Sequence, residues 1–323
     1  MTVRPFASLD PDTILSCIER AIGRRLLNVC RPHSSYINRV YELQDEAGTF
    51  VIAKFFRPDR WTEQGLLDEL RFVRDCEAQE LPVIAPLSLA DGSDLGTCGA
   101  IRFAVYPRCG GRVVDEYNDE QWLELGRLLG RLHRVGARRE ATGRNRLHPL
   151  HTTKDQIAYI LGNKLVHKNL VSQFERLGAE MIKEIGPCFE TVENIRIHGD
   201  CHSGNLIYRP GESFFIIDFD DMVVGPAVQD FWMLLPGSRE DCPLEISLLL
   251  EGYETFRRFD HRTLRLIEPL RAMRYIHYIS WCGRQYLEDG DTRINESFGS
   301  YTYWQQEIAD LEDQLKVIRE EDR

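Results

Sequence analysis

Three oxygen-bearing side chains near the middle of the chain, Asp200, Asn205 and Asp218, lie at the ends of short apolar runs. Residues 195–197 alternate apolar and charged side chains as a half-buried strand does, and Asp200 follows them after a glycine. A second apolar run, 214–217, follows a turn containing proline and glycine and ends directly on Asp218. Two strands paired through that turn would bring all three side chains around one small volume.

These residue types match the needs of phosphoryl transfer. Mg²⁺ prefers carboxylate and amide oxygens together with substrate phosphates, and Asp218 and Asn205 can supply both. Asp200 then remains as the carboxylate that orients an attacking hydroxyl group and accepts its proton. Any one of these residues is more simply explained as a turn residue. The ordered set, H-G-D-C-H-S-G-N followed by I-D-F-D, instead favours a kinase catalytic centre.

Neighbouring residues in the same block are expected to support the loop. His198 is interpreted as a brace, and His202 as a residue that shapes the loop or touches a phosphate. Asp220 is a second candidate metal ligand, because the period of two in a strand would place it on the face of Asp218. Asp230 opens an apolar helical segment, so it is expected to cap that helix or to brace the loop.

Several motifs resemble those of known kinases. H-G-D-C-H-S-G-N and I-D-F-D-D are similar to the catalytic and metal-binding loops of the aminoglycoside phosphotransferase and choline kinase group. Further runs, S-Y-I-N-R-V-Y, G-P-A-V-Q-D-F-W-M-L-L and L-I-E-P-L-R-A-M-R, resemble the stress response kinase A family, from about Ser35 to Arg274. The resemblance implies an α+β, two-lobed protein-kinase-like fold, Ser/Thr protein kinase activity and a nucleotide-binding role for Ser35.

Composition places the chain among ordinary globular proteins. Its 323 residues are enough for one two-lobed enzyme, and no apolar run is long enough to span a membrane. A net charge of −11 argues against a nucleic-acid partner, because phosphate backbones are held mainly by Lys and Arg. The first ten residues contain no apolar signal core. The nine cysteines include no C-x-x-C pair. We therefore expect a monomeric cytoplasmic protein with free thiols and without membrane association.

The first third of the chain is expected to form a nucleotide-covering lobe, residues 1–106. A helix is predicted over 9–27, followed by an antiparallel hairpin formed by 33–43 and 49–56. Ser34 and Ser35, at the start of this hairpin, offer hydroxyl and backbone N–H groups to phosphates. The alternative is that these serines simply begin a strand.

A lysine inside an apolar strand needs a partner. Lys54 lies within V-I-A-K-F-F, and in a kinase its partners would be the nucleotide phosphates and a helix glutamate. The predicted helix 62–78 supplies Glu69 beside its apolar stripe. We therefore predict a pair between Lys54 and Glu69, with a snorkelling edge-strand lysine as the alternative.

The strand predicted at 101–107 is expected to lead into the hinge between lobes. Backbone groups around Tyr106 and Arg108 would read an adenine edge, and Pro107 cannot donate a hydrogen bond there. The second lobe, residues 107–323, is expected to be mostly helical.

Three features of the second lobe bear on the site. Helices are predicted at 119–135, with His133 satisfied in the core, and over 154–185. The basic segment 137–148 is interpreted as a solvated loop, with a contact for an acidic protein substrate as the alternative. The late aromatic residues are either core, which is favoured, or a cage for a cationic substrate; they are Tyr275, Tyr278, Trp281 and Tyr286.

Together these patterns predict a kinase that uses ATP and Mg²⁺. Asp200 would position the acceptor hydroxyl, Asn205 and Asp218 would hold the metal, and Lys54 would hold the phosphates. The resemblance implies Ser or Thr hydroxyls of proteins as acceptors, including those of the chain itself. The alternatives are a small-molecule kinase and a nucleotide-binding pseudokinase.

Overall fold

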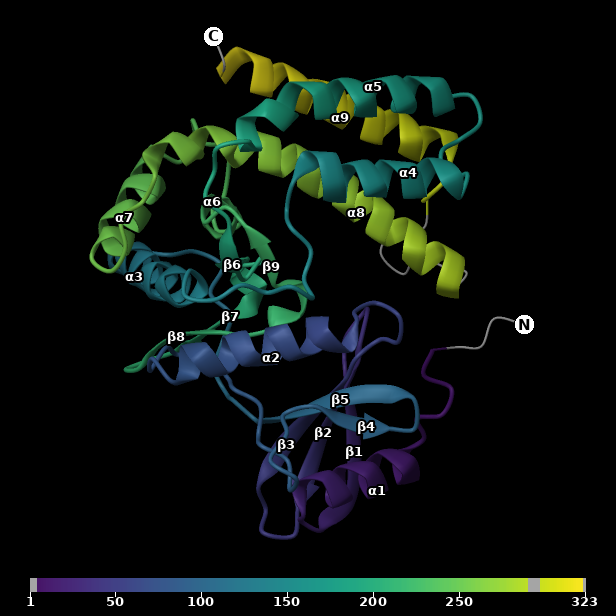
Figure 1. The fold of residues 1–323 in the computed structure, drawn as a ribbon, viewed down its shortest axis with the longest axis vertical. Helices are drawn as coiled ribbons and strands as arrows, with labels where there is room; N and C mark the ends of the chain where they lie inside the picture. The colour runs from purple at the N-terminus through teal and green to yellow at the C-terminus, as the bar shows by residue number, and fades with distance from the viewer. Residues whose placement is uncertain (1–4, 290–296, 322–323) are drawn as a thin grey trace.

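The N-terminal part of the protein is a five-stranded antiparallel sheet with one helix on each face (Figure 1). The computed structural model describes residues 5–289 and 297–321. The sheet order is β1-β2-β3-β5-β4, and its strands are β1 (Leu26–His33), β2 (Arg39–Asp45), β3 (Phe50–Phe55), β4 (Gly96–Cys98) and β5 (Ile101–Pro107). Helix α1 (Pro11–Ile22) packs on one face of the sheet, and helix α2 (Glu63–Glu77) lies on the face toward the helical remainder.

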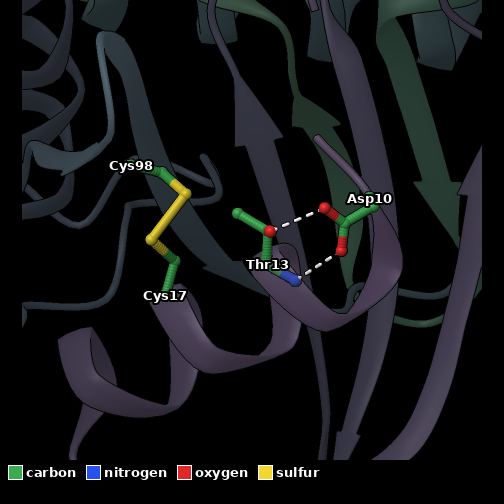
Figure 2. Close-up of a disulfide and its surroundings, with 4 residues drawn as sticks. All are labelled: Asp10, Thr13, Cys17 and Cys98. Carbon is green, nitrogen blue, oxygen red and sulfur yellow. Dashed lines mark hydrogen bonds between the residues drawn. A yellow bond between two sulfur atoms is a disulfide. The ribbon is translucent and has the colours of Figure 1, made fainter. Parts of the chain in front are cut away.

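The predicted first helix is shorter than expected. Asp10 caps it by accepting hydrogen bonds from the backbone N–H and the hydroxyl of Thr13, at 2.9 and 2.7 Å (Figure 2). Gly23 then adopts a left-handed φ of 65°, which ends the helix at Ile22. The next residues form strand β1, which the sequence analysis missed because this strand is mostly exposed and lacks strict alternation. The predicted hairpin is β2 with β3, so Ser34 and Ser35 lie in the β1–β2 connection.

A disulfide contradicts the expectation of nine free thiols. Cys17 of α1 is bonded to Cys98 of β4, as Figure 2 shows, with their Cα atoms 5.9 Å apart. Helix α1 buries Ile14 and Ile18 against the sheet, and this packing brings the two sulfurs together across 81 residues of sequence. Pairing at such a separation has no signature in cysteine spacing.

Helix α2 connects the two halves of the molecule. Thr62 caps it, and its residues Leu66 and Leu70 pack with Ala104 of the sheet. The opposite side of the helix contributes Phe72 and its neighbours to the large core of the helical part. A residue on α2 is therefore held from both sides, which suits a helix that positions a buried carboxylate.

The remainder of the chain is mostly helical, with two small strand pairs (Figure 1). Its α-helices are α3 (Asp119–Gly136), α4 (Lys154–Gly162), α5 (Val171–Ile185), α6 (Val228–Trp232), α7 (Pro243–Glu254), α8 (Ile267–Asp289) and α9 (Tyr301–Glu321). The helix predicted over 154–185 is two helices, because Lys164 adopts a left-handed φ of 55° between α4 and α5. Within residues 5–289 and 297–321, no helix is long and apolar enough to cross a bilayer.

The strand pairing around the catalytic block differs from the prediction. Strand β6 (Ile195–Ile197) pairs with β9 (Val223–Gly225), whereas the turn after Arg209 joins β7 (Leu206–Arg209) to β8 (Ser213–Ile216). Strand β6 was expected to be half-buried, with Arg196 facing solvent, but it is fully buried. Arg196 can be buried because its guanidinium bonds other residues of the protein. It bonds Asp75 at 2.8 Å and the Val135 carbonyl at 3.0 Å.

Candidate active site

Two cavities meet between the sheet and the helical part. The sheet-side cavity, about 490 Å³, is lined by Lys54, Val40, Ile52 and their neighbours on β2, β3, β5 and α2. The helix-side cavity, about 350 Å³, is lined by Asp200, His202 and residues of α8. Three residues line both cavities; they are Ser35, Asn38 and Asp218. A group transferred from one cavity to the other would pass beside these three residues.

The sheet-side cavity brings together all five residues predicted to contact nucleotide. They are Ser35, Lys54, Glu69, Tyr106 and Arg108. Val40, Ile52 and Val73 add apolar walls. A cavity with apolar walls and one buried lysine suits a flat aromatic base joined to an anionic tail.

Lys54 on β3 is the buried cation of this cavity. Its Nζ lies 2.7 Å from Asp218 Oδ1, 3.6 Å from Asp220 Oδ1 and 3.9 Å from Glu69 Oε1. Burial alone would lower the pKa of Lys54, but these three carboxylates raise it well above its ordinary value. The predicted contact with Glu69 is present, yet the nearest partner of the lysine is Asp218.

The nearest partner of Glu69 is Arg144, which the sequence analysis placed in a solvated loop. That interpretation is wrong for this residue. Arg144 is buried, and it donates to Glu69 Oε2 at 2.6 Å, to the Gly65 carbonyl at 2.7 Å and to the Asp220 carbonyl at 2.6 Å. Its guanidinium also stacks 4.1 Å from the ring centre of Trp61. Arg144 therefore joins helix α2 to the loop that carries Asp218.

The loop that carries Asp200 is held by buried hydrogen bonds. Asp230 accepts from the backbone N–H of His198 and of Gly199, each at 2.8 Å, and it also contacts His133 Nε2 at 3.0 Å. His198 Nε2 lies 2.9 Å from the Ile217 carbonyl, which ties this loop to the residue before Asp218. The predicted bracing roles of His198 and Asp230 are confirmed, as is the satisfied core position of His133.

Gly199 is required where the loop turns. It adopts a φ of 84°, and a Cβ at this position would lie 2.4 Å from the Asp221 carbonyl. This close approach sets the loop of Asp200 directly against the segment that follows Asp218.

Asp200 projects from this loop into the helix-side cavity. Its Oδ1 lies 2.7 Å from Arg274 Nη2 on α8, and its Oδ2 lies 3.5 Å from His202 Nε2. Burial alone would raise the pKa of Asp200, but His202 and Arg274 together lower it below its ordinary value. The carboxylate is thus held ionised and oriented. Arg274 was noticed only as part of a motif, and its sequence position gave no sign of this contact.

Asn205 and Asp218 present oxygens suited to a hard cation. The Asn205 side-chain N–H donates to the Asp200 carbonyl at 2.9 Å, so its Oδ1 faces away and accepts no bond from the described residues. The Asn205 carbonyl accepts from Ile217 N–H at 3.0 Å, which places this amide beside Asp218. Lys54 lowers the pKa of Asp218, whose carboxylate is therefore ionised at neutral pH. One carboxylate and one amide oxygen fit Mg²⁺, which takes its other ligands from water and phosphates.

Asp220 lies beside Asp218, although not for the predicted reason. Residues Phe219–Asp221 form a 3₁₀ turn, so the period of two that the prediction used does not apply. Asp220 Oδ1 is 3.6 Å from the Lys54 Nζ that Asp218 contacts, and both aspartates line the helix-side cavity. The other carboxylate oxygen of Asp220 bonds Arg60, and the same guanidinium bonds Asp221 Oδ1 at 2.6 Å. Asp220 therefore stays a candidate second metal ligand. In residues 5–289 and 297–321, no group of three or more His, Cys, Asp or Glu side chains forms a ready-made metal cage.

Comparison with known proteins identifies the family. The phosphotransferase enzyme family matches residues 29–267. Stress response kinase A of Escherichia coli, strain K12, is 35% identical over 98% of this chain and 95% of the relative. The chain belongs to the stress response kinase A family. A second relative, the serine/threonine protein kinase RdoA of Salmonella typhimurium, strain LT2, is 33% identical over the same shares of both chains, 98% and 95%.

Solved structures show the same fold at lower identity. Amicoumacin kinase hAmiN, in complex with AMP-PNP, Ca²⁺ and Ami, aligns with a TM-score of 0.76 at 20% identity, covering 95% of each chain. A microcompartment-associated aminopropanol kinase aligns at 0.67 and 16% identity, over 96% of this chain and 97% of its own. These comparisons confirm the predicted α+β, two-lobed kinase fold, and this member of the stress response kinase A family is a phosphotransferase.

The hinge differs in detail from the prediction. Arg108 does not offer its backbone N–H to an adenine edge, because that group donates to the Phe50 carbonyl at 3.3 Å at the end of the sheet. Its side chain bonds Glu42 at 2.8 Å. Cys109 and Gly110 line the same cavity, and their N–H groups have no acceptor among the described residues. These two positions replace Arg108 as candidates for a backbone contact with a base.

The sequence analysis favoured core positions for the aromatic residues of α8, and this is wrong for its three tyrosines, whereas Trp281 packs against the core. Tyr278 is 38% exposed, and both Tyr275 and Tyr286 are exposed as well. Tyr278 stacks on Trp281 with ring centres 5.8 Å apart, and Tyr36 meets Trp281 edge-on at 5.9 Å. Tyr36, Tyr278 and Trp281 line the helix-side cavity together with Asp200, and these aromatic rings form its rim.

Proposed function

We propose that this phosphotransferase transfers the γ-phosphoryl group of ATP to Ser or Thr hydroxyls of proteins, its own included, as part of a cytoplasmic stress response. The observation that carries the proposal is the meeting of the two cavities at Asp218, with Asp200 on the helix side alone. ATP would occupy the sheet-side cavity and place its γ-phosphate at the junction. The acceptor hydroxyl would approach from the helix-side cavity.

Each predicted residue has a place in this scheme. Asp200 orients the acceptor hydroxyl and takes its proton, while Lys54 contacts the nucleotide phosphates and is positioned by Glu69. Asn205 and Asp218 would hold Mg²⁺, which neutralises phosphate charge when bound. Ser35, Tyr106 and the side chain of Arg108 complete the nucleotide site. We also propose the lobe boundary at 106/107, at the last residues of β5.

A polypeptide acceptor is supported by the rim of the helix-side cavity and by the names of the relatives. Tyr36 is 59% exposed and Tyr278 is 38% exposed, so side chains at the rim are available to a large partner. One relative of similar length is named a serine/threonine protein kinase. Exposed aromatic residues beside a catalytic carboxylate suit an extended chain whose acceptor side chain enters the cavity.

A small-molecule acceptor is the second candidate. The neighbours in the fold comparison include kinases named for amicoumacin, aminopropanol and spectinomycin. The stacked pair of Tyr278 and Trp281 beside Asp200 would suit a compact cationic ligand. A pseudokinase is disfavoured, because Lys54, Asp200 and Asp218 line the two cavities and Asn205 is bonded to the Asp200 carbonyl.

Labelling with [γ-³²P]ATP and Mg²⁺ tests the proposal. The pure protein would be incubated alone, with a generic basic protein and with a generic acidic protein, beside an Asp200→Ala variant. We expect label on Ser or Thr that is absent with the variant. Absence of protein label, together with ADP release that depends on added hydroxyl compounds, would replace this proposal with the small-molecule kinase.

A further inference from the structure

A third, smaller cavity of about 120 Å³ adjoins the helix-side cavity along α8; we call it the α8 cavity. Asp221, Arg274 and His277 line both cavities, so the two spaces lie against each other at these residues. Trp61 and Thr153 belong to the remaining wall. Whatever enters the helix-side cavity to reach Asp200 therefore has this second space beside it.

Two hydrogen-bond donors of the α8 cavity have no partner among the described residues. They are Trp61 Nε1 and Thr153 Oγ1, both buried. Thr153 is 0% exposed, whereas the hydroxyl of its neighbour Thr152 donates to the His148 carbonyl at 3.1 Å. Buried donors in folded proteins are nearly always satisfied. Water can fill such a cavity, and an oxygen of a bound ligand would replace that water.

The residues between the two cavities add further donors. Arg274 Nη2 faces Asp200 at 2.7 Å, and among the described residues this is the one ion pair of the guanidinium. His277 Nδ1 accepts from the Gln156 amide at 2.9 Å, so a neutral imidazole carries its hydrogen on Nε2. Burial, reinforced by Arg274, lowers the pKa of His277 to about 4, which keeps the ring neutral at physiological pH.

The lining offers little to a cationic group. Asp221 is the one carboxylate among the residues that line the α8 cavity, and Arg60 already bonds it at 2.6 Å. The donors of Trp61 and Thr153 remain, together with the N–H groups of Arg274 other than the Nη2 that faces Asp200. A ligand group that only accepts hydrogen bonds, and that carries negative charge for the guanidinium, matches this set.

We propose that the α8 cavity binds a carboxylate of the acceptor substrate while the substrate hydroxyl lies against Asp200. On the proposed function, this group is an Asp or Glu side chain next to the phosphorylated Ser or Thr. The peptide nature of the substrate rests on that proposed function, whereas recognition of a carboxylate does not. Arg274 then serves both cavities, with Asp200 on one side and the substrate carboxylate on the other.

Binding of peptides that cannot accept a phosphoryl group tests the carboxylate site. Two peptides with a central Ala in place of Ser, flanked by Glu in one and by Gln in the other, would be titrated calorimetrically into the protein with Mg²⁺ and ADP. We expect the Glu peptide to bind about tenfold more tightly, as one charge-assisted hydrogen bond would give. Thr153→Val should reduce this preference, and Thr153→Ser, which keeps the hydroxyl, should restore it. The matched control is Thr142→Val at an exposed position.

A second experiment distinguishes failure of the carboxylate site from failure of the proposed function. ADP release would be measured with Ser peptides of both kinds and with small hydroxy acids beside their amides. If the protein phosphorylates hydroxy acids in preference to their amides but does not phosphorylate peptides, the carboxylate site is supported and the proposed protein kinase activity is rejected. Equal binding of the Glu and Gln peptides, together with equal use of acids and amides, would overturn the carboxylate site even if Ser peptides are phosphorylated. A preference unchanged in Thr153→Val would overturn it as well.

Discussion

The sheet-side and helix-side cavities share Asp218 but are built in different ways. The sheet-side cavity is built on neighbouring strands and α2, which carry its one buried lysine, and residues 108–111, 207 and 217–219 close it. The helix-side cavity is assembled from segments far apart in the sequence, around residues 35, 60, 200 and 277. Its acidic side chains are matched by Lys54 at Asp218 and by two arginines, Arg60 and Arg274, at the others.

This difference indicates how each cavity works. A pre-formed sheet with a fixed cation suits a cosubstrate of constant shape, since nucleotide binding needs little adjustment. Paired charges on separate segments can exchange partners when an acceptor arrives, so the helix-side cavity is where specificity can vary. We therefore expect substitutions on the two sides to separate nucleotide binding from transfer.

The largest effect is expected at Asp200, on the helix side alone. Asp200→Asn should lower turnover by about 10²–10⁴-fold, because the amide cannot accept the hydroxyl proton. Binding of AMP-PNP, measured by calorimetry, should be unchanged. Asp115→Asn, at an exposed position, is the control. Full turnover by Asp200→Asn would show that another group activates the acceptor.

Substitution of Asp218 tests the metal site at the boundary that the two cavities share. Asp218→Asn should weaken Mg²⁺-dependent nucleotide binding by more than about tenfold, a loss that even outer-shell changes cause at metal sites. Binding measured without metal should change less, since Lys54 remains. Titrations of nucleotide with and without Mg²⁺ give both affinities. Equal losses in the two titrations would remove Asp218 from the metal site.

Substitution of Arg144 tests whether this residue holds helix α2, on the sheet side, to the loop that carries Asp218. Arg144→Met should lower the free energy of unfolding by about 3–5 kcal/mol, because it leaves Glu69 buried without its nearest cation. Denaturant unfolding measures this loss, with exposed Arg146→Met as the control. A loss no larger than that of the control would show that Lys54 alone compensates Glu69.

Substitution of Arg274 tests how the charges of the helix-side cavity control the protonation of Asp200. Activity requires ionised Asp200, and Arg274 helps to keep the pKa of this carboxyl below its ordinary value. Activity is therefore retained as pH falls until Asp200 protonates at its lowered pKa. Arg274→Met should move the acidic limb of the pH–rate profile to higher pH. An unmoved limb would mean that Arg274 does not act on Asp200.

The smallest effect on activity is expected at the disulfide, which lies in the sheet half on α1 and β4. Closing a loop of 81 residues stabilises the folded state by about 4.5 kcal/mol in the chain-entropy description. Cys17→Ser should thus lower the midpoint of unfolding and leave KM for ATP unchanged. Thermal unfolding with and without reductant is the measurement, and a shift in KM would connect α1 to the nucleotide cavity.

The parts of the site that lie in contiguous motifs or follow from helical periodicity could be predicted from the sequence. The loop from His198 to Asn205 and the strand end at Asp218 are contiguous motifs, and Glu69 follows from helical periodicity beside Lys54. The fold class could be predicted from the same motifs by resemblance.

The remaining residues depend on packing between distant segments. Arg144 lies in a loop without periodicity, and its burial follows from contacts with α2 and the Asp218 loop. Arg274 and Tyr278 reach the site only because α8 crosses the helix-side cavity. In the sequence Arg274 looks like an ordinary surface residue, and Tyr278 was assigned to the core with a substrate cage only as the alternative. The acceptor side was therefore predicted only in that alternative.

Phosphoamino-acid mapping by mass spectrometry tests the central claim most directly. The wild-type protein and Asp200→Asn, each shown to bind AMP-PNP with equal affinity, would be incubated with ATP, Mg²⁺ and a protein acceptor. We expect phosphoserine or phosphothreonine with the wild type and none with the variant. Equal phosphorylation by both proteins would contradict the assignment of Asp200 and, with it, the division of the site into a nucleotide side and an acceptor side.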